Sequence, residues 1–369
     1  MLRRSLITVE SITTLSTPSL ASALCAAVQD RLDEPTMKRA YEKLHRKAAV
    51  VTVWYLASYV GVLLTRGWLL GLVSCTSLAM SMAAVGFNIQ HDANHNAFFD
   101  PRGSKRLTRA NALAGWSLVA VGASPKRWIS GHVISHHATP NVVGRDADID
   151  LGALARLAPE QPWRPWHRYQ HIYIWILYSL TAVLIILGDV TATLSEALRR
   201  DAKSPSLTTW VVLLSSKAIF FGAMLVVPMI FHPALIVALG ALYVSLLTGL
   251  ILAVVFQSAH VLDDAEFAKD RPTTSWHEWQ VRSSLDFSHG TTVPARLLRW
   301  YIGGLDHQTE HHLFPRLPHT TYPLIAPVVS EVCAQFSLPR VVHPTLRSAL
   351  RSHLRHLRAM GAPTGEVPT

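Results

Sequence analysis

The sequence predicts an all-α integral membrane protein, with four membrane-spanning helices in two hairpins and a cytoplasmic helical cap. Three observations lead to this fold class. Half of the 369 residues are hydrophobic and only 16% are charged, whereas a soluble domain usually carries about 25% charged residues. Uncharged apolar stretches recur between short basic runs, and several reach the about 17–25 residues that cross a bilayer. Histidines gather at the ends of several of these stretches.

The first hairpin is predicted from two neighbouring uncharged stretches, at about residues 48–65 and 67–90. A link of residues 65–67 joins them, which is too short for anything but a turn. Lys and Arg residues are concentrated between 31 and 47, just before the first stretch. Because positive residues stay in the cytoplasm, the N-terminus is expected there, and the second helix returns its end to the same side.

The second hairpin is predicted at about residues 214–231 and 233–258, and a further apolar stretch at 171–188 precedes it. If all three stretches crossed the membrane, His260 would lie on the opposite side from His91. Only two crossings place both histidines on the cytoplasmic side.

Interfacial segments account for the remaining apolar sequence. The basic run at residues 199–203 is expected in the cytoplasm, with the Lys217 side chain extending toward the same surface. We therefore expect residues 171–188 to lie in the interface or to dip in without crossing, and the shorter apolar stretch 111–124 to lie there too.

The two ends flank a single membrane domain at residues 48–345. Residues 1–47 are expected to form a loose tail and an amphipathic lead-in helix, and residues 346–369 a basic C-terminal tail with a surface helix. The first apolar stretch begins after Lys47, so no cleavable signal peptide is expected. The net charge of +10 fits anionic lipid or an acidic partner. No nucleic-acid recognition motif accompanies it.

Histidine clusters are the main functional signal. Nine of the 19 histidines lie at the predicted cytoplasmic ends of the apolar stretches, often spaced i, i+4 on one helix face. They are His91, His95, His132, His136, His137, His260, His307, His311 and His312.

Metal binding gives these clusters a chemical reason. Buried imidazoles without partners are costly, and neutral imidazole is a common metal ligand. Eight or nine ligands are too many for one ion and suit two, although imidazole does not distinguish zinc, copper, iron and nickel. The H-E-x-x-H pattern of zinc peptidases does not occur, and the three cysteines lie too far apart for an iron–sulfur cluster or zinc ribbon. A membrane metal transporter or sensor is the alternative of another class, and it predicts polar residues in mid-span.

Together these motifs resemble the membrane fatty acid desaturases, which have three histidine boxes, and most closely the bacterial and front-end branch. The first box reads H-D-A-N-H and the last contains Q-x-x-H-H. The matching stretches are residues 91–98, 132–141, 144–148, 256–261 and 303–315.

The resemblance implies a non-haem di-iron centre on the cytoplasmic face, molecular oxygen as co-substrate, and a fatty acyl chain as substrate. It implies an oxygen-dependent desaturase, with an acyl hydroxylase or acetylenase of the same fold as the alternative. Electrons are expected from a separate ferredoxin or b-type cytochrome, because no H-P-G-G haem-binding signature occurs. The acyl chain can be carried by CoA, by acyl carrier protein or by a membrane lipid. The expected location is a bacterial inner membrane.

Two features of the site stay open at the level of sequence. In the front-end branch the third box begins with Gln, which corresponds to Gln308, so His307 and Gln308 compete for one ligand position. Trp279–Gln280 stands where relatives often have His–Gln.

Acidic and amide residues beside the boxes are expected to orient the imidazoles through their second ring nitrogen. These are Asp92, Asn141, Asp146, Asp148, Asp263 and Glu310.

Overall fold

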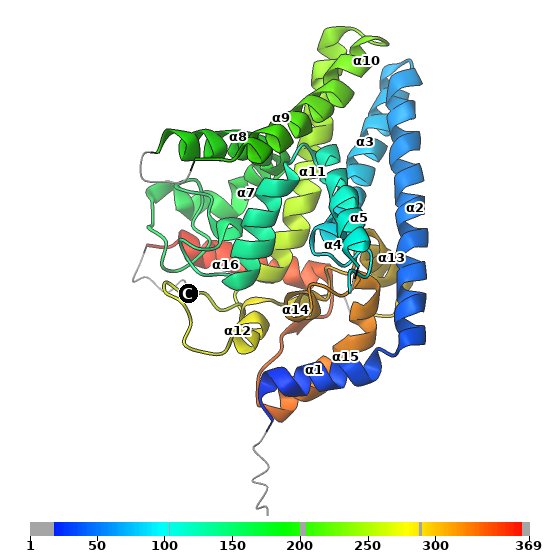
Figure 1. Ribbon diagram of the computed structural model, residues 1–369. Coiled ribbons are helices and arrows are strands. Elements are labelled where there is room, and N and C mark those ends of the chain that lie inside the picture. Colours follow the sequence, from blue (N-terminus) through cyan, green and yellow to red (C-terminus); the bar gives the residue numbers. More distant parts are fainter. Residues whose placement is uncertain (1–17, 103, 200–203, 288–289, 364–369) are drawn as a thin grey trace, which may run out of the picture.

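The structure is a computed structural model that describes residues 18–102, 104–199, 204–287 and 290–363. Two long helical hairpins stand side by side, and shorter helices gather around their lower ends (Figure 1). The tail at residues 1–17, the run at 200–203 and the C-terminal residues 364–369 lie outside the described residues, so the expectations for these segments are not addressed.

The first hairpin consists of α2 (Glu34–Leu64) and α3 (Trp68–Val85). The Asp33 carboxylate caps α2 by accepting from the Thr36 amide at 2.9 Å. The expected lead-in helix and the first span therefore form one continuous helix, while a separate α1 (Leu20–Arg31) precedes it. Gly67 has φ 100° at the turn, a conformation that glycine adopts without strain.

The second hairpin consists of α9 (Leu207–Phe221), α10 (Val227–Met229) and α11 (Ala234–His260). A π-helical turn, η6 (Gly222–Val226), interrupts the first arm. Pro228 explains the interruption, because proline has no amide hydrogen and its ring clashes with the carbonyl four residues earlier. The two arms span Leu207–Met229 and Ala234–His260, where stretches at about 214–231 and 233–258 were expected.

The two segments expected at the interface are each divided. Residues 111–124 contain the end of α5 (Lys105–Gly115) and a 3₁₀ turn, η2 (Trp116–Val121). Residues 171–188 break at Leu180 between α7 (Gln170–Ser179) and α8 (Thr181–Leu198). In Figure 1, α8 runs crosswise to the long hairpins.

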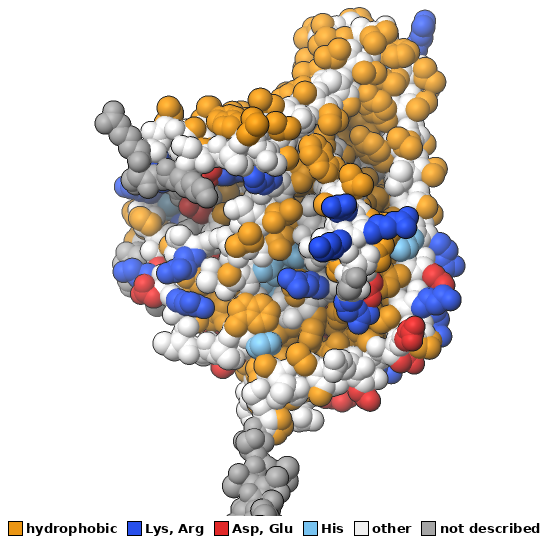
Figure 2. All heavy atoms as spheres, in the orientation of Figure 1, with side chains coloured by type: hydrophobic (Ala, Val, Ile, Leu, Met, Phe, Trp, Pro, Cys, Tyr) orange, Lys and Arg blue, Asp and Glu red, His pale blue; other side chains and the backbone are white. Residues whose placement is uncertain are grey.

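Membrane crossing is possible for five described helices by length and composition: α2, the α3–α4 helix, α8, the α9–α10 helix and α11. Their outer faces carry exposed Leu, Val, Ile and Phe side chains. Figure 2 shows these hydrophobic side chains covering the upper part of the molecule, with Lys and Arg gathered lower down, over α5. The protein is thus a mostly helical membrane protein, as the sequence predicted.

Lys217 corrects one expectation. Instead of extending to the surface, this α9 residue is 8% exposed, and its Nζ lies 2.6 Å from Oδ2 of Asp189 on α8. The same Asp189 oxygen accepts from the Ser124 amide at 2.7 Å. A buried ion pair therefore fixes the crosswise helix to the second hairpin.

The lower layer contains short helices and one small sheet. The strands β1 (Asp286–Phe287) and β2 (Val342–His343) pair in parallel. The C-terminal helix α16 (Leu346–Gly361) packs on α7 and α11 through buried residues such as His353 and His356. It is part of the body of the protein, where a surface helix on a basic tail was expected. The remaining elements are α4 (His91–Asn94), η1 (Gly86–Gln90), α6 (Pro125–Trp128), η3 (Ile129–His136), η4 (Ala147–Ile149), η5 (Pro165–Tyr169), α12 (Trp276–Ser283), α13 (Val293–Tyr301), α14 (Gln308–Leu313), η7 (His319–Thr321) and α15 (Tyr322–Gln335).

Candidate metal centre

The histidine boxes come from four separate parts of the chain and meet below the hairpins. The first box lies where α3 continues through the π turn η1 into α4, and the second lies on the π-helical η3. His260 is the last residue of α11. The third box lies on α14. Irregular helical turns are frequent at functional sites, and two of the boxes are on or beside one.

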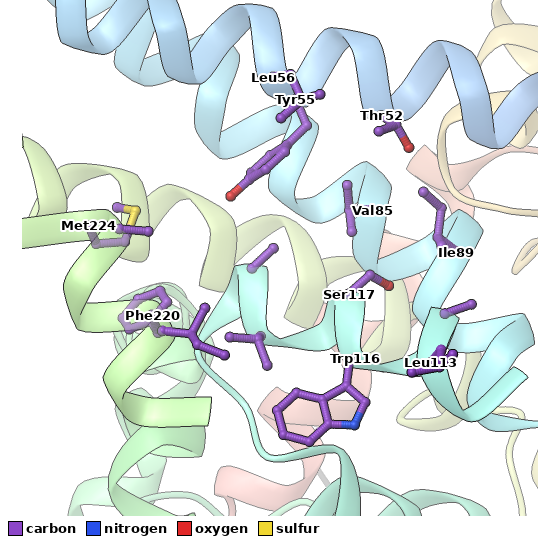
Figure 3. Close-up of a pocket in the computed structure, with 15 residues that line it drawn as sticks. Thr52, Tyr55, Leu56, Val85, Ile89, Leu113, Trp116, Ser117, Phe220 and Met224 are labelled. Carbon is purple, nitrogen blue, oxygen red and sulfur yellow. The ribbon is translucent and has the colours of Figure 1, made fainter. Parts of the chain in front are cut away.

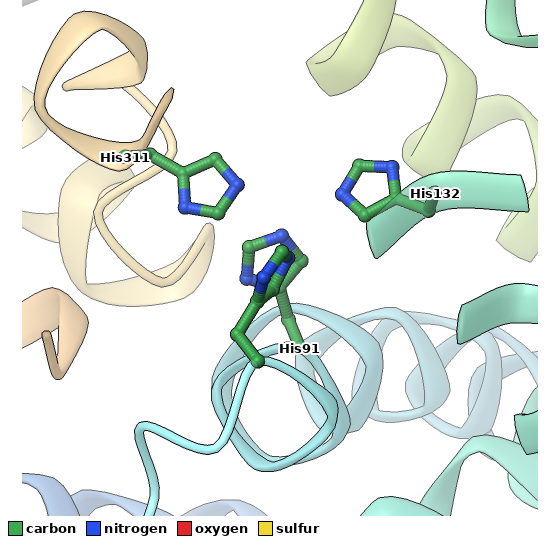
Figure 4. A group of neighbouring side chains, drawn as sticks. His91, His132 and His311 are labelled. Carbon is green, nitrogen blue, oxygen red and sulfur yellow. The ribbon is translucent and has the colours of Figure 1, made fainter. Parts of the chain in front are cut away.

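Eight of the predicted ligands converge with ring nitrogens close enough to hold metal ions. In the described part of the chain they form overlapping groups whose candidate ligand atoms lie within 4.8 Å of one another. Figure 4 shows rings of one such group, labelled at His91, His132 and His311, facing a common space from three elements. The groups are His91, His95, His132 and His311; His136, His260 and His312; His137, His311 and His312; and His132, His136 and Asp148.

The outer ring nitrogens of several of these histidines are held by the surrounding protein. Nδ1 of His132 lies 3.2 Å from Oδ2 of Asp148, and Nδ1 of His136 lies 3.0 Å from Oδ1 of Asp146. Nδ1 of His260 donates to the Ser283 carbonyl at 3.1 Å. Such partners fix the tautomer and the orientation of each ring, with Nε2 left to face the centre.

The inner ring nitrogens form a set of buried polar atoms that lack protein partners. Among the described residues, Nε2 of His91, His95, His132 and His311 has no hydrogen-bond partner, nor has either ring nitrogen of His137. Leaving one such atom unsatisfied costs about 1–3 kcal/mol. Metal ions would satisfy one such nitrogen of each ring, so the donor set fits a metal centre.

The protonation of the site also suits metal binding. Burial, and then the neighbouring imidazoles, hold the pKa of His137, His311 and His312 well below the usual 6.5. Burial lowers the pKa of His132 to about 4 against the opposing effect of Asp148. Burial also lowers the pKa of His136, but the carboxylates of Asp146 and Asp148 outweigh it and raise the value to about 9. Most of these imidazoles are therefore neutral at pH 7, the form that binds metals.

The two residues at the start of the third box, His307 and Gln308, lie in different surroundings. Nε2 of Gln308 lies 3.1 Å from Nε2 of His260, inside the cluster. Nδ1 of His307 instead lies 3.5 Å from a carboxylate oxygen of Glu310. His307 belongs to none of the metal-compatible groups found among the described residues.

Most of the acidic and amide residues expected beside the boxes do lie there. The Asn141 side chain donates to the His260 carbonyl at 2.9 Å, and the Asn141 backbone amide donates to the Asp146 carboxylate. Glu310 forms an ion pair with Arg340 at 2.6 Å. Asp263 differs, because it binds Arg355 of α16 at 2.6 Å, so its expected role beside a box is not supported.

Sequence reasoning missed several partners. Gln280 accepts from Nδ1 of His312 at 2.8 Å and donates to the His137 carbonyl, although its Trp–Gln context departs from that of its relatives. The Tyr322 hydroxyl lies 3.1 Å from Nδ1 of His311. The position of Gln280 stood out in the sequence, because Trp279–Gln280 lies where relatives often have His–Gln, but no role could be assigned to it from the sequence.

A buried polar chain leads away from the first box. Oδ2 of Asp92 lies 2.8 Å from Nδ1 of His319, and Nε2 of His319 lies 2.9 Å from Nζ of Lys47. On the other side, Oδ1 of Asp92 lies 4.0 Å from Nδ1 of His91. Neither His319 nor Lys47 could be predicted as a partner of this box, because both are far from it along the chain.

Hairpins that end in a buried cluster of imidazoles able to hold metal ions are typical of histidine-rich membrane metalloproteins. Comparison with known sequences specifies it further. The sequence model of the fatty acid desaturases matches residues 66–344. The chain belongs to this family, and it is a fatty acyl desaturase, an oxidoreductase.

The relatives include cyanobacterial and moss enzymes. The chain is 34% identical to an sn-1 linoleoyl-lipid 6-desaturase of Arthrospira platensis, over 86% of this chain and 85% of that protein. It is 30% identical to the protein of the same name in Synechocystis sp., over 88% and 90%. An acyl-lipid (8-3)-desaturase of Physcomitrium patens is 34% identical, over 85% of this chain and 66% of its own length. The prediction of a desaturase is thereby confirmed.

Proposed function

We propose that the eight converging histidines hold two iron ions and that Gln308, and not His307, lies at the remaining ligand position. The observation that carries this proposal is the polarity of the rings: the outer nitrogens of His132, His136 and His260 are bonded to protein, and Nε2 of His91, His95, His132 and His311 has no hydrogen-bond partner among the described residues. The ligands are His91, His95, His132, His136, His137, His260, His311 and His312.

Replacement of one central ligand tests this assignment. His136→Ala should abolish desaturation and lower the bound iron, because the ring is 1% exposed and nothing else fills its place. Bound iron is measured per protein after purification, beside product formation. Intact iron content with full activity would contradict the assignment.

The third box is tested by a pair of variants. Gln308→Ala should lower iron retention, whereas His307→Gln should retain wild-type iron, since His307 lies beside Glu310 and outside the cluster. The reverse result would assign the position to His307.

The reaction follows from the family and from the position of the site. Removal of two hydrogens from adjacent CH₂ groups, with O₂, two electrons and two protons, gives one double bond and two water molecules. The iron centre supplies the oxidising power to break unactivated C–H bonds. The protein fixes the ring positions through Asp146, Asp148 and Gln280, and its burial of the cluster keeps water away.

We further propose four membrane spans with both termini and the metal centre in the cytoplasm of a bacterial inner membrane. Support comes from α8, which meets the length for a span but runs crosswise to the hairpins (Figure 1). It comes also from His91 and His260, which end neighbouring helices and meet in one cluster. Protease accessibility of a tag at each end, in inside-out and right-side-out vesicles, tests this topology.

The names of the relatives support a lipid-linked substrate, and the electron donor is proposed from the family alone. We infer that the acyl chain is esterified to a membrane lipid, because both cyanobacterial relatives are named sn-1 linoleoyl-lipid 6-desaturases. A separate ferredoxin or b-type cytochrome supplies the electrons. Fatty-acid profiling of a host that expresses the chain with a matched ferredoxin tests both, and a hydroxylated or acetylenic product would contradict the desaturation.

A further inference from the structure

We propose that a cavity between the tips of the two hairpins, far from the metal centre, binds one acyl chain of a phospholipid that the enzyme does not desaturate. This lipid belongs to the leaflet opposite the metal centre, and its chain packs between the two hairpins. The inference goes beyond the proposed function and rests only on the proposed topology of four spans.

The cavity has the size and the walls that a hydrocarbon chain needs. It lies between the hairpin tips, at the top of Figure 1, and its volume is about 780 Å³, within the range of ligand sites. Its walls are mostly apolar, with Leu72 and Leu78 on α3 and with Pro228, Ile236 and Val244 on α10 and α11. A hydrocarbon chain would gain contacts along these walls, whereas water would find few hydrogen-bond partners there.

Two glycines explain why the facing helices leave this space open. Gly71 of α3 and Gly240 of α11 both line the cavity. A Cβ added to Gly71 would meet nothing within 4 Å beyond its own helix, and a Cβ added to Gly240 would meet only Sγ of Cys75, at 3.6 Å. A large side chain at either position would therefore extend into the cavity and take the place of a bound chain.

The depth of the cavity matches one leaflet of a bilayer. Its lining residues run from Arg66 to Leu78 along the first hairpin and from Pro233 to Val244 along the second. At 1.5 Å per residue these stretches are about 16–18 Å long, and one leaflet contributes about 15 Å of hydrocarbon. A single acyl chain whose headgroup lies at the hairpin tips would therefore run the length of the cavity.

Arg66 supplies a contact for the headgroup. Among the described residues that line the cavity it is the one Lys or Arg, and it is exposed in the turn between α2 and α3. Figure 2 shows a basic side chain at this end of the molecule, next to a surface that is otherwise hydrophobic. A guanidinium group forms paired hydrogen bonds with a phosphate, so this position favours a phospholipid over an uncharged lipid.

The cavity is too far from the metal centre to hold the chain that reacts there. Its innermost lining residues are Leu78 on α3 and Val244 on α11. At 1.5 Å per residue they lie about 20 Å from His91 and about 24 Å from His260 along the two helices. A chain that fills this cavity from the hairpin tips therefore ends well short of the histidines.

A hydrogen bond marks the inner end of the cavity. Tyr59, which lines it, donates from its hydroxyl to the carbonyl of Ala223 at 2.7 Å. Ala223 lines a second cavity, of about 410 Å³, that lies farther down the hairpins. Figure 3 shows this second cavity, with Met224, which lines both, at its edge. The contact between Tyr59 and Ala223 keeps a bound chain in the half of the membrane near the tips.

Two further contacts join the hairpins around the cavity. The His232 ring, in the turn before α11, donates from Nε2 to the Val62 carbonyl of α2 at 2.8 Å. The hydroxyls of Thr76 on α3 and Tyr243 on α11 lie 2.9 Å apart. These contacts hold the tips at a fixed spacing, and a chain between them would supply the packing that the side chains leave out.

The test uses the iron-loaded enzyme, stripped of lipid in a mild detergent and kept without an electron donor. It is titrated with dipalmitoyl phosphatidylglycerol or with dipalmitoyl glycerol, which has the same chains and no phosphate. Gly71→Trp places an indole in the cavity, and Arg66→Gln removes the charge at its open end. The matched controls are Gly188→Trp, on an exposed and open position of α8, and Arg347→Gln, on an exposed position of α16. Native mass spectrometry counts the bound lipids, and the unfolding temperature is measured with and without lipid.

Cys75 reports the occupancy of this cavity separately from any lipid at the metal centre. Its thiol is free and lines the cavity, whereas Cys25 is exposed elsewhere and Cys333 is buried. In a Cys25→Ser background, phosphatidylglycerol at about four times its dissociation constant should slow the modification of Cys75 by methyl methanethiosulfonate about fivefold. The same concentration of dipalmitoyl glycerol should protect the thiol less.

Gly71→Trp should bind one phosphatidylglycerol fewer than the wild type and should lose the rise in unfolding temperature that the lipid causes. Arg66→Gln should weaken the binding of phosphatidylglycerol about fivefold and leave that of dipalmitoyl glycerol unchanged. Both controls should behave as the wild type. The labelling of Cys75 keeps the test decisive if Gly71→Trp fails to fold.

A rate of Cys75 modification that does not respond to phosphatidylglycerol would overturn the proposal. So would a folded Gly71→Trp variant that binds as many lipids as the wild type. An equal loss of the two lipids in Arg66→Gln would overturn the choice of a phospholipid. Because no readout depends on desaturation, failure of the proposed function and failure of this site are told apart.

Discussion

At the residue scale, the chain of Lys47, His319 and Asp92 connects the first helix, the segment after the third box and the first box. All three side chains are at most 6% exposed. Because Lys47 donates to Nε2 of His319, Nδ1 of His319 carries the proton that Asp92 accepts. This arrangement holds the Asp92 carboxylate beside His91, a proposed iron ligand.

We predict that His319→Ala weakens iron binding about 10–100-fold, the usual effect of losing a residue that orients a ligand. The Asp92 carboxylate would then lose its fixed position and His91 its orientation. Iron retained against increasing chelator is the measurement, and His171→Ala, on the distant α7, is the control. Equal retention in wild type and His319→Ala would show that this chain is only structural.

The histidines of the boxes could be predicted from the sequence, whereas the partners of their rings could not. Box residues follow from local spacing, since i, i+4 histidines share a helix face before any fold is known. The partners Gln280, Tyr322 and His319 are ordinary residues until tertiary contacts bring them to a ring nitrogen. Asp263 is a residue that the sequence placed beside a box and the structure does not. It lies close to His260 along the chain, but its carboxylate binds Arg355 and not a ring of the cluster.

At the element scale, the crosswise helix α8 depends on the buried pair of Lys217 and Asp189. Both side chains are 8% exposed, and their charged atoms lie 2.6 Å apart. Sequence reasoning placed the α8 region outside the membrane-crossing set, but it did not foresee this pair, since it took Lys217 to extend to the surface.

Lys217→Met should destabilise the protein by about 3–5 kcal/mol, because it leaves the Asp189 carboxylate buried without its cation. The double variant Lys217→Met with Asp189→Leu should recover part of this loss, as it removes both charges. Thermal unfolding in detergent gives the comparison. If the single variant were as stable as the wild type, the pair would have no role in holding α8.

The docking of α16 is expected to depend on pH through His353. Its Nδ1 lies 2.6 Å from the Val261 carbonyl and its Nε2 2.9 Å from the Tyr178 hydroxyl. Burial lowers the pKa of His353 to about 4, against the usual 6.5 in the unfolded chain. As the pH falls through 6.5, the unfolded chain binds a proton that the folded chain does not, so stability falls until about pH 4.

His353→Gln should flatten this dependence, because glutamine can keep both hydrogen bonds without titrating. The loss between pH 6.5 and 4 should be smaller in the variant by up to about 3 kcal/mol. The difference between the two unfolding profiles is decisive, since other buried histidines contribute to both. Parallel profiles would mean that His353 does not titrate in this range.

At the scale of the whole molecule, the fold class could be predicted because bilayer length and charge asymmetry act on single segments. The ends and breaks of the helices could not be predicted from the sequence. The turns η1, η3 and η6 are irregular, and their geometry depends on the elements packed against them. The meeting of the boxes followed only from topology: His91 and His260 had to end on one side.

Removal of the metal should therefore loosen the molecule as a whole. The proposed ligands lie on α4, η3, α11 and α14, so bound ions connect both hairpins to the lower layer. Iron present at about a thousand times its dissociation constant would stabilise the folded state by about 4 kcal/mol per ion. A strong chelator should lower the unfolding temperature of the wild type in detergent. Adding iron back should restore that temperature. His136→Ala with His312→Ala should be far less sensitive to the chelator, because both residues belong to the same group of ligands. A wild-type unfolding temperature that does not respond to the chelator, after loss of iron has been verified, would show that the four elements hold together without the ions.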